Sequence, residues 1–144
     1  MEYLHEKGRN RAFEYTPAFH YYGRMVTANH KIEPDPSDVL GTAVLRASER
    51  MGLSRTDLAR VIGRDRSSIS RSGVDPDSKA GELAKILIRC YRALAVMVDD
   101  NPEQIREWLS TRNRHTGGIP EQQLQSVAGL ISVSEYLDAI RGKV

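Results

Sequence analysis

Cysteine is almost absent from this chain, and long apolar runs are missing. Cys90 is the only cysteine among 144 residues, which excludes an intramolecular disulfide and a cluster of thiolate metal ligands. No apolar run approaches the roughly 20 residues that a membrane-spanning helix needs, and residues 1–25 lack the apolar stretch of a secretory signal. We therefore expect a protein of the reducing cytoplasm that has no membrane partner.

The residue patterns of catalytic and metal sites are missing as well. The four histidines are scattered without metal-ligand spacing, and no nucleophile-and-base pair or phosphate-binding glycine loop is present. Asp99 and Asp100 are neighbouring carboxylates, but adjacent residues at a helix end point apart and usually face solvent. We expect neither an enzyme nor a bound cofactor.

Charge is distributed unevenly, although the formal net charge is only +2. Residues 54–73 carry five arginines against two aspartates, whereas residues 99–144 carry seven acidic and five basic residues. The basic segment suits an anionic partner, and the acidic end suits a different one.

Helical signals cover the chain from residue 37 onward, and no segment predicts a strand, so we expect an all-α fold of about seven helices. Residues 80–98 are apolar nearly all round, which predicts a central buried helix with Cys90 as a small core residue. The first two helices are expected at 37–51, capped by Ser37 and stopped by Gly52, and at 54–62, where Ser54 and Asp57 form a capping box. The others are expected at 66–72 with Asp65 as cap, at 102–109 and at 120–128, followed by a final helix that Ser132 and Glu135 open as a capping box.

We expect three parts along the chain. Residues 1–36 read as an aromatic arm and a proline linker, within which Met25 is an alternative start. Residues 37–98 form a DNA-binding domain that includes the central helix, and residues 99–144 form a small C-terminal domain.

The stretch from residue 53 to residue 71 predicts a helix-turn-helix unit. Two short helices cross steeply only when the contact residues are small and the turn permits a left-handed backbone. Ala59 supplies the small contact, Gly63 the turn, and Ile69 an apolar side chain that reaches back into the shared core. An ordinary helical hairpin is the alternative interpretation.

In such units the second helix enters the major groove of DNA, and a dimer binds an inverted repeat. Arginine pairs with guanine acceptors, serine bonds to bases or phosphates, and flanking arginines contact phosphates. The predicted DNA-binding residues are Arg55, Arg64, Arg66, Ser67, Ser68, Ser70 and Arg71. For each arginine, a solvated surface charge is the competing interpretation.

Residues 53–71 resemble the Xre-type DNA-binding domains, which are Cro- and repressor-like. The C-terminal part resembles the toxin-binding domain of Xre/MbcA/ParS-type antitoxins. The residues that carry this second resemblance are Trp108-Leu109, Asn113, Gly117-Gly118-Ile119-Pro120, Leu124, Gly129, Tyr136-Leu137 and Ile140.

The resemblance implies an antitoxin whose C-terminal domain covers the active site of a RES-domain toxin that consumes NAD, and whose Xre-like half represses its own operon. The predicted toxin-binding residues are Trp108, Pro120, Tyr136, Arg141, Lys143 and the terminal Val144. Tyr136, Leu137 and Ile140 could instead pack on Trp108 in the core. The alternative function is a stand-alone dimeric helix-turn-helix repressor whose C-terminal domain only dimerises.

Overall fold

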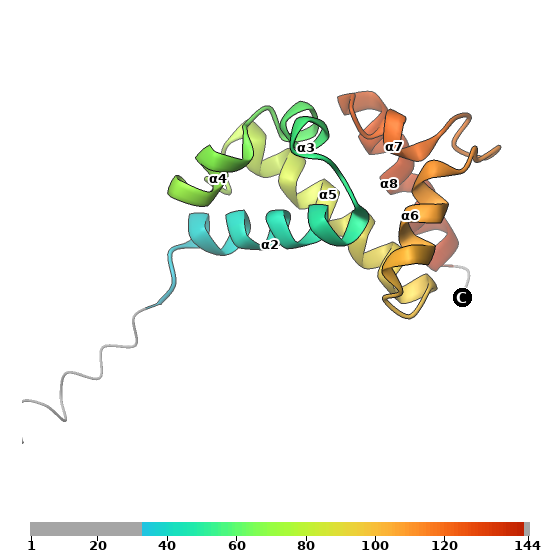
Figure 1. Cartoon of the computed structure of the whole chain (residues 1–144), viewed down its shortest axis with the longest axis horizontal. Helices are drawn as coiled ribbons and strands as arrows, with labels where there is room; N and C mark the ends of the chain where they lie inside the picture. The colour runs from blue at the N-terminus through green and yellow to red at the C-terminus, as the bar shows by residue number, and fades with distance from the viewer. Residues whose placement is uncertain (1–32, 143–144) are drawn as a thin grey trace, which may run out of the picture. The chain divides into compact units, whose positions relative to one another are not determined.

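Helix α5 (Lys79–Met97) is the element on which the rest of the fold packs. In this computed structural model, which describes residues 33–142, α5 lies against α2 (Pro36–Met51), α3 (Arg55–Ile62) and α8 (Val127–Arg141) (Figure 1). Leu87 and Leu94 are fully buried along it, and Cys90 is buried among them. The predicted central helix is therefore confirmed, although its last turn leaves the core with Val96 71% and Met97 41% exposed.

The described residues form seven helices, which confirms the predicted all-α class. The remaining three are α4 (Arg66–Ser72), α6 (Pro102–Ser110) and the single turn α7 (Pro120–Gln123). Within the described range, the only β-type pairing is an isolated bridge between Asn113 and Gly118 that closes the loop before α7. In the same range no helix is both long and apolar enough to cross a bilayer.

The first helix begins one residue earlier than predicted. Asp35, not Ser37, is its cap, because the Asp35 carboxylate accepts a 2.8 Å hydrogen bond from the backbone N–H of Ser37. Pro36 then takes the first helical position, where its missing N–H costs nothing. The helix ends at Gly52, as predicted, in a left-handed conformation with φ 72°.

Local chemistry sets the bounds of the next two helices as the sequence predicts. Ser54 and Asp57 form the expected capping box at the start of α3, and Gly63 ends that helix with φ 76°. Asp65 caps α4 by accepting from the backbone N–H of Ser68 at 2.9 Å.

The prediction for the final helix was wrong at its start. Ser132 lies inside α8, and the true cap is Ser126, whose hydroxyl accepts from the Gly129 N–H at 3.1 Å. The preceding helix is correspondingly shorter than predicted and stops at Gln123. A side chain at Gly129 would overlap the carbonyl oxygen of Gln123, so this tight entry requires glycine at the third position of the helix.

Residues 34–142 pack as one compact unit, to which both predicted domains contribute. The predicted boundary at residue 98 falls one residue after the end of α5. The predicted arm, the alternative start at Met25, and the predicted toxin contacts Lys143 and Val144 lie outside the described residues.

Candidate DNA and toxin interfaces

Helices α3 and α4 adopt the packing that the helix-turn-helix prediction requires. Ile69 is 2% exposed and joins the common core, while Gly63 makes the left-handed turn between the helices. The N-terminal part of α2 also meets the end of α4 closely, since a Cβ at Gly41 would lie 2.8 Å from the Cα of Gly73. This packing holds α4 with one face in the core and the other towards solvent.

Two of the predicted DNA-binding arginines already have partners inside the protein. Arg66 at the start of α4 forms an ion pair with Glu49 of α2. Arg64 is half-buried and donates a 3.2 Å hydrogen bond to the carbonyl oxygen of Gly73. Arg64 therefore links the residues that precede and follow α4. The ion pair with α2 orients Arg66.

The other predicted DNA contacts divide between capping and exposed side chains. Ser68 donates its hydroxyl to Asp65 at 2.8 Å, and its hydrogen bonds lower the pKa of the Asp65 carboxyl. The remaining four predicted residues are exposed on α3 and α4, and these are Arg55, Ser67, Ser70 and Arg71. Their contacts with DNA stay a prediction, and their exposure leaves them available for it.

The aromatic residues of the C-terminal segment form a stack. Trp108 of α6 and Tyr136 of α8 are nearly parallel with ring centroids 6.4 Å apart, and His115 stacks on Tyr136 with centroids 5.5 Å apart. Leu137, on the same helix, is fully buried. Tyr136 is thus fixed between two rings, and its place in the stack follows the alternative interpretation in which it packs on Trp108.

The other predicted toxin contacts differ in accessibility. Pro120 is buried at the start of α7, where proline fixes the first turn. The side chain of Arg141, 50% exposed, lies 4.0 Å from Asp138 on the last turn of α8. The toxin contacts of both residues stay predictions, and Arg141 is the more accessible of the two.

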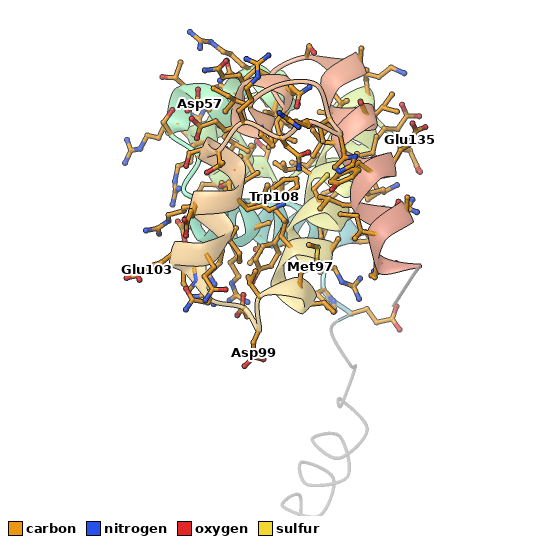
Figure 2. The ribbon with its side chains drawn as sticks, turned by 90° about the vertical axis from the view of Figure 1, so that its right-hand side faces the viewer. Asp57, Met97, Asp99, Glu103, Trp108 and Glu135 are labelled. Atoms are coloured by element: carbon orange, nitrogen blue, oxygen red, sulfur yellow. The ribbon has the colours of Figure 1, made fainter. Side chains whose placement is uncertain are left out.

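Trp108 also lines an open groove of about 580 Å³ between the end of α5, helix α6 and the loop that follows it. We call it the Trp108 groove, and its lining includes Val98, Glu107, Trp108, Arg112, Asn113 and Arg114. Trp108 and Met97 are labelled in Figure 2, which shows the molecule turned by 90° from the view of Figure 1.

A second groove, of about 520 Å³, runs between α2, α5 and α8, and its lining includes Lys85, Arg89, Arg92 and Arg141. Arg89 pairs with Asp138 at 2.7 Å, and Lys85 donates to the carbonyl of Pro76 at 2.7 Å. Much of the positive charge of this groove is therefore used within the fold.

Sequence reasoning missed two polar connections between the helix-turn-helix and C-terminal segments. Gln125, between α7 and α8, donates to Asp57 and accepts from Arg60, each at 3.1 Å. Asp100 accepts from the Tyr91 hydroxyl at 2.8 Å and pairs with Arg50. The Tyr91 hydrogen bond and the Arg50 guanidinium lower the pKa of Asp100, which is therefore a structural carboxylate rather than a free surface charge.

Ser126, three residues before Gly129, is a second possible helix start in the sequence, but no local pattern links Gln125 to Asp57, which lies 68 residues earlier. In the part of the chain that the structure describes, no three metal-ligating side chains gather into a group that could hold an ion.

Comparison with known families agrees with this arrangement. Residues 30–87 match the family described as the antitoxin Xre-like helix-turn-helix domain. Residues 93–143 match the family described as the antitoxin Xre/MbcA/ParS C-terminal toxin-binding domain. The chain belongs to the Xre-type antitoxins. None of the curated proteins matches it.

The two matches assign different partners to the two segments of the antitoxin. The first covers α2, α3, α4 and the N-terminal part of α5, which hold the exposed residues of the predicted DNA surface. The second begins near the end of α5 and includes the aromatic stack and all of the Trp108 groove. DNA and a toxin are therefore the partners that this antitoxin's two segments imply.

Proposed function

We propose that this antitoxin neutralises a RES-domain toxin that degrades NAD, and that it does so by covering the toxin's active site with the C-terminal end of α8. The observation that carries the proposal is the position of Arg141. Its side chain is half exposed at the last turn of a helix that packs into the core through Leu130, Val133 and Leu137.

A side chain displayed in this way is well suited to insertion into a cleft. The helix that carries it is already ordered, so binding loses little conformational entropy. Arginine is also enriched among the residues that dominate protein interfaces. The predicted contacts Lys143 and Val144 lie two and three residues after Arg141 in the sequence.

The second half of the proposal is repression of the antitoxin's own operon. The exposed side chains of Ser67, Ser70 and Arg71 on α4 would contact base edges in the major groove, and Arg55 at the start of α3 would contact phosphate. Because one such unit makes few contacts, we propose that a homodimer binds an inverted repeat.

The match of residues 93–143 to a toxin-binding domain favours this function over a stand-alone repressor. A repressor would need the C-terminal segment only for dimerisation. The two functions differ in one observable, because only an antitoxin stops the activity of a toxin.

The test is an NAD-hydrolysis assay with the purified RES-domain toxin of the same operon. We expect hydrolysis to stop when the antitoxin is added in equimolar amount, and Arg141→Glu to weaken this inhibition at least about tenfold, since a reversed charge opposes the native complementarity. Arg46→Glu, an exposed arginine of α2, is the matched control. Continued NAD hydrolysis with saturating antitoxin would contradict the proposal.

A further inference from the structure

The Trp108 groove combines apolar and cationic lining. Val98 and the half-buried Trp108 supply apolar surface. Arg112 and Arg114 are exposed, and within the described residues neither forms an ion pair. Glu107 adds one negative charge, so the cations of the groove exceed its anions.

The last turn of α5 also exposes apolar side chains. Val96 and Met97, the last residues of α5 before Val98, are 71% and 41% exposed. Large apolar side chains at such exposure, next to a groove that contains tryptophan and arginine, are typical of an interface core. The stack with Tyr136 fixes the position of the Trp108 ring, so the groove is formed before any partner binds.

We infer that the Trp108 groove is a second docking site for the toxin, and that it receives a toxin segment in which an apolar side chain neighbours a carboxylate. The inference rests on the proposed function, because it adds a contact site to the same partner. The apolar side chain would lie on Trp108 and Val98, and the carboxylate would pair with Arg112 or Arg114.

The location of the groove favours the toxin over other occupants. Every residue that lines it lies in the segment that matches the toxin-binding domain, and none lies in the helix-turn-helix match. A second copy on a two-fold axis would bring the same arginines towards each other. The chain's own residues 1–32 carry five Lys and Arg against three Glu, so their net positive charge does not complement Arg112 and Arg114.

The experiment measures the affinity of the full-length antitoxin for the purified RES-domain toxin by calorimetry. The test variant is Arg112→Glu with Arg114→Glu. The matched control is Arg46→Glu with Lys79→Glu, which makes the same charge change at exposed sites outside both grooves. Both variants alter exposed side chains, and an unchanged melting temperature verifies their folding.

We expect the groove variant to raise Kd at least about tenfold and the control to change it less than about threefold, since reversing a complementary interface charge is more costly than reversing a distant one. Equal binding by the groove variant and the wild type would overturn the inference while leaving the proposed function intact. An equal loss in the control would also overturn it, because the effect would then follow net charge. If the wild type itself does not bind the toxin, the proposed function fails.

Discussion

The side-chain amide of Gln125 lies 3.1 Å from the carboxylate of Asp57, and this hydrogen bond joins the α7–α8 connection to the capping box of α3. The amide oxygen of Gln125 also accepts from Arg60 at 3.1 Å. One side chain of the toxin-binding segment thus contacts two residues of the helix-turn-helix segment. The two segments are connected through this contact as well as through α5.

Replacing Gln125 with alanine is expected to lower the free energy of unfolding by about 1 kcal/mol, the usual net value of a partly buried hydrogen bond. Urea denaturation measures the change. Gln122→Ala is the matched control, because Gln122 is an exposed glutamine three residues earlier. Equal stability of the two variants would show that the contact with Asp57 contributes nothing.

Gly129→Ala is expected to destabilise the antitoxin by about 3 kcal/mol, since overpacking against backbone cannot be relieved by a rotamer change. The new methyl group would overlap the carbonyl oxygen of Gln123 and lie 2.9 Å from the Ser126 hydroxyl. At Gly142 a methyl group would make only ordinary contacts, with the nearest atom 3.4 Å away. Thermal unfolding of Gly129→Ala beside Gly142→Ala tests this, and a neutral Gly129→Ala would disprove the tight helix entry.

Cys90 is expected to make stability fall at alkaline pH. Burial raises the pKa of its thiol from 9.0 to about 11, so between these values the unfolded chain loses a proton that the folded chain keeps. The contribution of the protonated thiol to the free energy of unfolding is fully present below pH 9. Above pH 9 it falls by about 1.4 kcal/mol per pH unit, until the folded thiol also ionises.

The measurement for Cys90 is the free energy of unfolding against pH for the wild type and Cys90→Ala. At neutral pH the variant is less stable because it leaves a cavity, but its decline between pH 9 and pH 11 should be shallower than that of the wild type. Parallel curves would contradict the role of the thiol.

Arg71→Ala is expected to weaken operator binding by about 1–3 kcal/mol and to relax sequence preference if the arginine contacts a base. Arg71 is exposed on α4, whereas Arg66 is held by Glu49. Fluorescence anisotropy with operator and scrambled DNA measures both effects, and Arg46→Ala is the control. Unchanged operator affinity would exclude Arg71 from the DNA surface.

Most helix boundaries could be predicted because their causes are local. Asp65 caps α4 through a residue three positions later, and Gly52 and Gly63 end their helices because glycine adopts a left-handed backbone without strain. The apolar residues on nearly every side of α5 likewise predicted its central position, since such a helix must contact neighbours on several sides.

The start of α8 shows where local signals fail. Ser126 and Ser132 are both followed by residues compatible with a helix start, and the sequence alone favoured Ser132. The close approach of the Gln123 carbonyl to Gly129 decides for Ser126, and this contact exists only after α7 has folded against α8.

By itself, therefore, the sequence determined the helices with local caps, the helix-turn-helix pattern and the toxin-binding resemblance, because each depends on residues close together in the chain. Only the tertiary structure decided which predicted site residues are accessible. It paired Arg66 with Glu49, stacked Tyr136 between Trp108 and His115, and placed Arg112 and Arg114 beside Trp108 in an open groove. These arrangements depend on how helices pack, and no spacing along the chain encodes them directly.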